Sequence, residues 1–312
     1  MSARQRGAAL LAAMLTVTLV ATFAAAALWQ QWRTVEVETA ERARVQSAWI
    51  LTGALDWSRL ILIEDGRAGG PDHLAEPWAV PLEEARLSTF LAAERNVAQV
   101  DDGASEDAFL SGRILDLQAR LNVANLVQGG AVNEVAQAQF RRLFALLGLP
   151  ASELDLLVQG LRQAQVGGAE APGAPLWPQS LPQLVWLGLA PQTLALLAPH
   201  ATLLPERRGV NLNTAGAEVL MAVLPGLDRA GAERLITARQ AQHFRSLDDV
   251  RALLGSGVEL DTGELTVASA YFEVQGRLRL GQMVVQERSV VRRQGMEATT
   301  VLRERVGAPV LP

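Results

Sequence analysis

The residue types that most often carry out chemistry are scattered in this chain of 312 residues. It contains no cysteine, which excludes disulfides and thiolate metal sites. Its histidines, His73, His200 and His243, lie far apart and never in the HExxH spacing of zinc enzymes. The carboxylate pairs Glu83-Glu84 and Asp248-Asp249 occupy positions typical of solvated helices or caps. No nucleophile elbow or strand-following glycine-rich loop is present, so the sequence predicts no catalytic residues and no enzyme.

Acidic residues are densest at Asp101-Asp102-Gly103 and Glu106-Asp107. An EF-hand loop needs alternating carboxylates, a central glycine and a distal glutamate, and this patch lacks that order. We therefore predict a solvated loop, no metal site and no cofactor. The formal net charge of −5 shows no basic excess that would indicate a nucleic-acid partner for the whole chain.

Residues 210–250 contain the sharpest internal motif, which predicts two short helices joined by a hairpin and followed by a third helix. Asn213 and Thr214 are expected to cap the first helix, because short polar side chains accept hydrogen bonds from free backbone N–H groups. The second helix is expected over residues 230–240. Ser246 and Asp249 form a capping box for the third. This pattern resembles the helix-hairpin-helix module.

The hairpin of this motif, Leu224-Pro225-Gly226-Leu227, is where DNA-binding versions of the module present backbone N–H groups to phosphate. Pro225, Gly226 and Asp228 are the candidate contact residues. Asp228 stands where a second glycine would let phosphate approach, and its charge repels phosphate. DNA binding is therefore the alternative function, and a structural role for the hairpin is preferred.

The elements that position these residues start from an uncharged apolar run, Ala8–Leu28. Its length is that of a membrane-spanning helix, about 20 residues. Arg4 and Arg6 precede it, which predicts a cytoplasmic N-terminus, and Trp29 follows at the far interface. A secretory signal peptide cleaved near Ala24–Ala27 is the alternative, but the helical pattern continues past the tryptophans.

Residues 29–65 are expected to continue this helix outside the membrane as an amphipathic spine. Apolar residues recur on one stripe while most charges lie off it, and no heptad is sustained, which argues against a coiled coil. The glycine-rich stretch 66–72 ends the helix. A short helix is then expected near residues 82–94, and alternation over 113–126 predicts a strand and turn.

Gly129-Gly130 is expected to open a helix-rich domain, residues 130–260, and strands follow it. After Ala268 the period changes to two, which predicts strands over 271–280, 283–291 and 298–306. Their apolar face needs a cover, which the spine helix can supply. The predicted fold class is α+β: a long N-terminal transmembrane and spine helix, a C-terminal antiparallel sheet, and an inserted all-α domain with a helix-hairpin-helix-like segment.

Arg4-Gln5-Arg6-Gly7 before Ala-Ala-Leu-Leu resembles the class III leader of type IV pilins and type II secretion pseudopilins. The resemblance implies that prepilin peptidase cuts between Gly7 and Ala8 and methylates the new N-terminus. Most members have glutamate at the fifth mature position, where this chain has Ala12. The K-type minor pseudopilin, general secretion pathway protein K, is the member that lacks this glutamate.

The Asn-x-Asn-Thr-Ala and Leu-Pro-Gly pattern also recurs in the K-type family, which is identified here over nearly the whole chain. The resemblance implies domains 1–7 (leader), 8–28 (transmembrane), 29–65 (spine), 66–129 (pilin-like, first strand), 130–260 (inserted helical) and 261–312 (terminal strands). K-type proteins usually carry an acidic, calcium-associated insertion near residues 166–178, where this chain has only Glu170. The acidic insertion is not evident here, so no cofactor is predicted, and calcium, which the family resemblance implies, is the alternative.

The function implied by the resemblance is that of a minor pseudopilin at the pseudopilus tip, which helps to initiate assembly and the export of folded periplasmic proteins. Its implied partners are the I- and J-type minor pseudopilins, the major pseudopilin, prepilin peptidase and the inner-membrane secretion platform. It would be a single-pass inner-membrane protein with its bulk in the periplasm. The alternative function is a membrane-anchored helix-hairpin-helix DNA-binding protein of a DNA-uptake system.

Overall fold

A computed structural model of the chain describes residues 3–89, 108–167, 173, 175–255, 260–281 and 283–306. The acidic patch at 101–107 and Glu170 lie outside these residues. One helix, α1 (Ala3–Ala68), contains the apolar run and the spine without interruption. Its 66 residues correspond to about 100 Å. In the part of the chain that is described, it is the one helix long and apolar enough to span a membrane.

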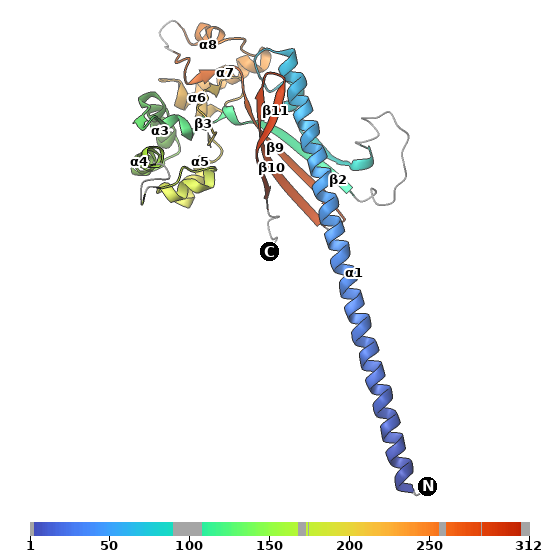
Figure 1. The fold of residues 1–312 in the computed structure, drawn as a ribbon. Helices are drawn as coiled ribbons and strands as arrows, with labels where there is room; N and C mark the ends of the chain where they lie inside the picture. The colour runs from blue at the N-terminus through green and yellow to red at the C-terminus, as the bar shows by residue number, and fades with distance from the viewer. Residues whose placement is uncertain are drawn as a thin grey trace.

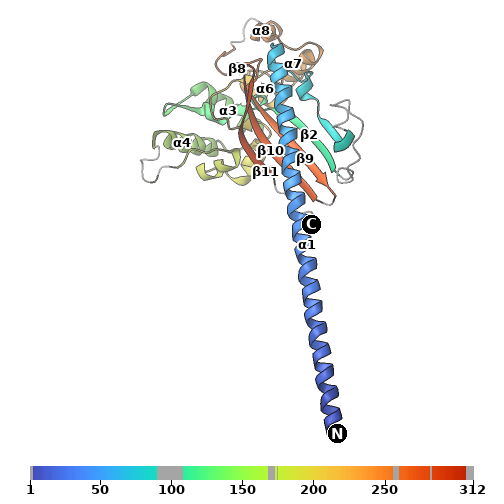
Figure 2. The ribbon, with the colours of Figure 1, turned by 45° about the vertical axis from the view of Figure 1, so that its right-hand side comes forward.

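The outer half of α1 lies across one face of a five-stranded antiparallel sheet (Figures 1 and 2). In sheet order the strands are β1 (Leu82–Arg86), β2 (Ala108–Asp116), β9 (Tyr271–Leu280), β10 (Met283–Gln294) and β11 (Glu297–Val306). The last three confirm the strands predicted from the period-two pattern, and β9 pairs with β2 across a long insertion. The α+β fold class is confirmed.

The contact between α1 and the sheet follows from helical spacing in the sequence. Leu51, Leu55 and Leu62 project from one side of the helix and are buried. Leu55 and Leu62 share a core with Phe272 and Val274 of β9, among others. A Cβ at Gly276 would meet Leu51 at 3.2 Å, so glycine allows the helix to approach the sheet closely.

Of the short helix expected near residues 82–94, residues 82–86 instead form the edge strand β1, which is a correction, while residues 87–89 are helical as predicted. β1 pairs with β2, Glu83 is exposed at the sheet edge, and Glu84 forms an ion pair with Arg279 of β9. Backbone pairing with β2 overrides the weak local preference of these residues. The strand predicted over 113–126 is also corrected: β2 runs from Ala108 to Asp116, and two 3₁₀ turns, η2 (Leu117–Ala119) and η3 (Val123–Leu126), follow it.

The inserted segment forms a separate helical body beside the sheet, at the end of α1 farthest from the N-terminus (Figure 1). Its helices are α3 (Glu134–Leu146), α4 (Ala151–Gly167), the 3₁₀ helix η5 (Leu181–Leu187), α5 (Pro191–Leu197), α6 (Ala217–Val223), α7 (Arg229–Ala241) and α8 (Leu247–Leu254). Short strand pairs join its segments: β3 (Leu121–Asn122) with β6 (Ala201–Thr202), β4 (Val127–Gln128) with β5 (Ala131–Val132), and β7 (Val210–Asn211) with β8 (Leu265–Thr266).

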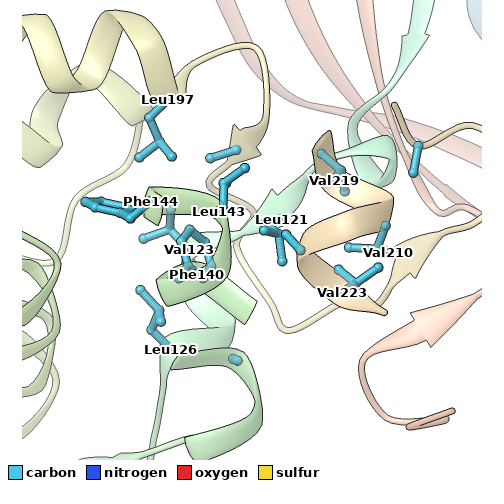
Figure 3. Close-up of a cluster of buried hydrophobic side chains, with 14 of the residues drawn as sticks. Leu121, Val123, Leu126, Phe140, Leu143, Phe144, Leu197, Val210, Val219 and Val223 are labelled. Carbon is cyan, nitrogen blue, oxygen red and sulfur yellow. The ribbon is translucent and has the colours of Figure 1, made fainter. Parts of the chain in front are cut away.

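This helical body has one core, which Figure 3 shows in part. Phe140 and Leu143 of α3 lie against Leu121 and Leu126, which come from before Gly129. Val210 and Val219 complete the same cluster from the other side. The predicted division at residues 129 and 130 therefore falls inside this core rather than at its edge.

Candidate functional site

The helical body is attached to the sheet and to α1 by buried polar groups, which we call the polar junction: Asp72, Asp116, Asn211, Thr214, Ser269 and Arg293. Asp116 ends β2 and is 5% exposed. Its Oδ2 accepts hydrogen bonds from Thr214 Oγ1 at 2.6 Å, Ser269 Oγ at 2.7 Å and Asn211 Nδ2 at 3.2 Å. One carboxylate thus joins β2, the helical body and the segment before β9.

Burial raises the pKa of Asp116 to about 6, and the hydrogen bonds from Thr214, Ser269 and the Gln118 backbone N–H lower it in part. This balance is the expected one for a buried carboxylate that has no cation of its own but several donors. Hydrogen bonds to the Asp116 carboxylate, rather than an ion pair, therefore hold this part of the polar junction together.

The same junction is tied to the end of α1 through Arg293 of β10. The guanidinium forms ion pairs with Asp65 of α1 and with Asp72, and both partners are largely or fully buried. Asp72 Oδ2 accepts the Ser269 backbone N–H at 2.6 Å, and its backbone carbonyl accepts from Asn211 Nδ2 at 3.1 Å. The last turn of the spine, the sheet and the helical body are therefore locked together at one place.

Asn213 and Thr214, predicted as helix caps, have a different role, and that expectation is corrected. Gly216 stands at the N-cap of α6 without a side-chain bond. Asn213 instead donates to the Phe244 carbonyl at 2.9 Å and accepts the Phe244 N–H at 2.8 Å, while Thr214 bonds Asp116. Both side chains satisfy buried tertiary partners, which outweigh the local cap that the sequence offers.

A second buried carboxylate, Glu264, holds the helical body together internally. It is 3% exposed and accepts hydrogen bonds from Asn125 Nδ2 at 2.6 Å, Asn133 Nδ2 at 2.7 Å and Arg207 at 2.6 Å. These partners lie 57 to 139 residues away in the sequence. No local pattern marks Glu264, so sequence reasoning missed it as it missed Asp116.

The hairpin between α6 and α7 contains Pro225, Gly226 and Asp228. Gly226 has a φ of 77°, which favours glycine. The Asp228 side chain caps α7 by accepting the Gly231 N–H at 2.7 Å. This carboxylate occupies the helix end that would otherwise attract phosphate. The geometry therefore gives the hairpin a structural role, and a contact role for these three residues stays a prediction.

The residues described also bring three carboxylates together: one oxygen each of Asp65, Asp72 and Glu76 lies within 4.8 Å of the others. Arg293 already contacts two of them, so a guanidinium supplies positive charge where a cation would. Glu76 Oε2 accepts from the His73 backbone N–H at 2.8 Å and from Trp78 Nε1 at 2.7 Å. Beside it the rings of His73 and His243 stack, with centroids 3.8 Å apart.

Burial raises the pKa of Glu76 to about 7, with further upward contributions from Asp65 and Asp72. The stability that Glu76 contributes is therefore complete below about pH 4.5 and is lost as the pH rises through 7. The free energy of unfolding of Glu76→Gln minus that of wild type is expected to be about 1–2 kcal/mol larger at pH 8 than at pH 5. This figure allows for the partial exposure of Glu76. Chemical unfolding of the full chain in detergent at both pH values measures this difference.

The exposed Glu83→Gln variant is the control and should show no such difference. Because His73 has its pKa lowered by burial and by His243, its own contribution changes with pH in the opposite sense. The comparison of Glu76→Gln with wild type cancels it. If the stability difference between Glu76→Gln and wild type is the same at pH 5 and at pH 8, the raised pKa assigned to Glu76 is wrong.

The leader residues lie at the start of α1. Gly7 and Ala8 are within the continuous helix, and Ala12 is exposed on it one turn later. The helix is exposed from Ala9 to Leu28, as the surface of a membrane anchor must be. Cleavage at Gly7 and the role of Ala12 stay predictions.

A membrane-length helix continuing into a spine, an antiparallel sheet under that spine and a helical insertion between the strands define a pilin-like protein. Two family models described as "Type II secretion system (T2SS), protein K" match residues 119–206 and 210–270. The type II secretion system protein K of Pseudomonas aeruginosa is 28% identical over 307 residues, covering 89% of this chain and 85% of that protein.

Among solved structures, the GspK–GspI–GspJ complex of the enterotoxigenic Escherichia coli type 2 secretion system has a chain with this fold. Its TM-score is 0.67 at 18% identity, covering 86% of this chain and 99% of that chain. Two segments of the chain therefore match the type II secretion system protein K family, and these similarities support a minor pseudopilin of that system. Nothing in these comparisons supports the DNA-uptake alternative.

Proposed function

We propose that this minor pseudopilin is a non-enzymatic structural subunit at the tip of the pseudopilus, where it helps to initiate assembly and the export of folded periplasmic proteins. The observation that carries this proposal is the position of the helical body. It extends sideways from the sheet at the end of the molecule farthest from the anchor (Figures 1 and 2). A subunit with this bulk at its outer end obstructs the stacking of another subunit beyond it.

Ala12 supports the same position. In pilin-like assemblies the glutamate at this place pairs with the N-terminal amine of a neighbouring subunit, and an unpaired charge in a low-dielectric setting is costly. Alanine cannot pair with the amine of a subunit placed ahead. The first subunit has no such neighbour, so the missing carboxylate costs it nothing.

The partners follow from the assembly. The solved relative is in a complex with GspI and GspJ, and we extend that partnership to the I- and J-type minor pseudopilins of this system. The major pseudopilin, prepilin peptidase and the inner-membrane platform complete the set. On the side of α1 opposite Leu51 and Leu55, Trp49 and Leu60 are 72% and 58% exposed, which suits packing against a neighbouring spine helix.

This proposal places the protein in the bacterial inner membrane, with a cytoplasmic N-terminus and the sheet and helical body in the periplasm. The support is the single anchor helix and the two arginines, Arg4 and Arg6, before it.

Ala12→Glu tests the tip position in a strain complemented with the full-length chain. A carboxylate without a partner inside the membrane is costly, up to about 2.5–3.5 kcal/mol at the centre of the span and less toward the cytoplasmic end, where residue 12 lies. We expect the fraction of the protein cross-linked at the pseudopilus end, and secretion with it, to fall by about tenfold or more. Ala12→Ser adds a small uncharged group and should behave like wild type. Unchanged tip occupancy with normal secretion in Ala12→Glu would remove the role given to the missing glutamate.

A further inference from the structure

Five arginines share the sheet face opposite α1, and we call this set the arginine face: Arg86, Arg113, Arg277, Arg279 and Arg288. The strand register places them together. Arg113 is next to Ile114, which packs toward α1, and therefore points the other way. Arg277 and Arg279 flank Leu278, which also contacts the α1 side. Arg86 pairs across the strands with Phe109, which itself pairs with Arg279.

Carboxylates only partly neutralise this face. Glu84 accepts from Arg279 at 2.6 Å and lies 3.9 Å from Arg277, and Glu273 lies 3.0 Å from Arg288. Glu304 faces Arg288 across β10 and β11. Five guanidinium groups thus meet three carboxylates, a surplus of positive charge on a chain whose net charge is −5.

Two of the five arginines have no carboxylate partner among the described residues. Arg113 is exposed and its Nε donates only to the neutral Gln275 side chain at 2.7 Å. Arg86 is exposed and lies 5.8 Å from the Phe109 ring centroid, with Arg279 at 4.0 Å from the same centroid. Arg113, Arg277 and Arg288 also line a hollow of about 600 Å³, together with Glu83, Glu84 and Glu287. The guanidinium of Arg113 is the cation at this hollow that has no carboxylate partner among the described residues.

The position of the arginine face indicates what can reach it. The helical body covers the other end of this sheet face, where Leu204 packs on Tyr271 and Val290. The arginines lie toward the β9–β10 turn, on the opposite face from Leu51 but at its level along α1, and hence on the membrane side of the sheet (Figure 1). Leu51 is 23 residues beyond Leu28, about 35 Å of helix, which is several Debye lengths from lipid headgroups.

We propose that the arginine face binds a carboxylate-rich surface on the globular part of the minor pseudopilin that follows this subunit on the membrane side. This inference rests on the proposed tip position, because a tip subunit has its neighbours on that side only. The guanidinium groups of Arg86 and Arg113, which have no carboxylate partner among the described residues, favour acidic protein side chains, which arginine binds in a bidentate manner.

The test measures binding of the full-length mature chain in detergent to the I-type and the J-type minor pseudopilin of the same system, at 50 to 300 mM NaCl. We expect the double reversal Arg113→Glu/Arg277→Glu to raise the Kd for one of them by at least about tenfold and to abolish its weakening by salt. Arg113→Lys/Arg277→Lys keeps the charge and should raise the Kd much less.

The matched control is Arg141→Glu/Arg234→Glu, which reverses two exposed arginines of the helical body that have no ion pair among the described residues. It should leave the Kd unchanged, and equal melting temperatures of all variants show that folding is intact. If the reversal variant binds the minor pseudopilin with the same Kd and the same salt dependence as wild type, the role proposed for the arginine face is wrong, while the partnership stands. Failure of wild type to bind either subunit overturns the proposed partnership instead. Loss of binding to anionic vesicles with unchanged pseudopilin binding would assign the face to lipid and also overturn the inference.

Discussion

Replacing Asp116 with alanine is expected to lower the free energy of unfolding by about 3–5 kcal/mol and to loosen the helical body from the sheet. The substitution leaves Thr214 Oγ1, Ser269 Oγ and the Gln118 N–H without their carboxylate acceptor in a buried site, whereas Asn211 Nδ2 keeps the Asp72 carbonyl. Each buried donor left unpaired costs about 1–3 kcal/mol, and the relief of a buried carboxylate offsets part of the total.

Thermal unfolding and limited proteolysis of the full chain in detergent measure both effects. Proteolysis should release a fragment that contains the helical body before the sheet is cut. Asp155→Ala, at an exposed position on α4, is the control and should change the unfolding free energy by less than about 0.5 kcal/mol. A melting temperature of Asp116→Ala equal to that of wild type would show that the polar junction does not hold the two parts together.

Gly7→Val is expected to abolish processing of the leader and, with it, secretion. The class III leader places Gly7 at the residue after which prepilin peptidase cuts, so the mature chain should begin at methylated Ala8. Mass spectrometry of the membrane-extracted protein, from cells with and without the peptidase, measures the N-terminus directly. In wild type the Ala8 end should disappear only when the peptidase is absent.

Gly53→Ala provides the control, since this glycine lies in the same helix and a Cβ there would meet no atom within 4 Å. It should be processed normally, and its helix should be more stable by up to about 1 kcal/mol. A wild-type chain that retains Met1, or that is cut near Ala27, would contradict the leader assignment.

Periodicity in the sequence is sufficient to predict the outer frame of this fold. The apolar stripe of α1 and the alternation in β9, β10 and β11 appear in the structure because each pattern reflects one buried face. The resemblance to K-type pseudopilins indicates the family from the sequence alone. Both depend on residues that are close in the sequence or on a short recognisable motif.

The polar junction could not be predicted in the same way. Asp116 meets Thr214 and Ser269 across 98 and 153 residues, and no local rule connects positions so far apart. The side chains of Asn213 and Thr214 could cap a helix as well as they form these tertiary hydrogen bonds, so a prediction from neighbouring residues alone assigned them the wrong role. The signal that was present is the run Asn211-Leu212-Asn213-Thr214, where amides and a hydroxyl interrupt buried apolar residues.

The continuous helix α1 also has a mechanical consequence. Residues 29–42 make no buried contact in the single chain, whereas the last turn is clamped through Asp65 to Arg293. A force applied along the anchor is therefore transmitted through the exposed helical segment 29–42 to the ion pair of Asp65 with Arg293, because α1 is continuous between them. Residues 29–42 are where α1 would bend first. The spine helices of neighbouring subunits that pack against this segment would therefore determine the stiffness of the assembled pseudopilus.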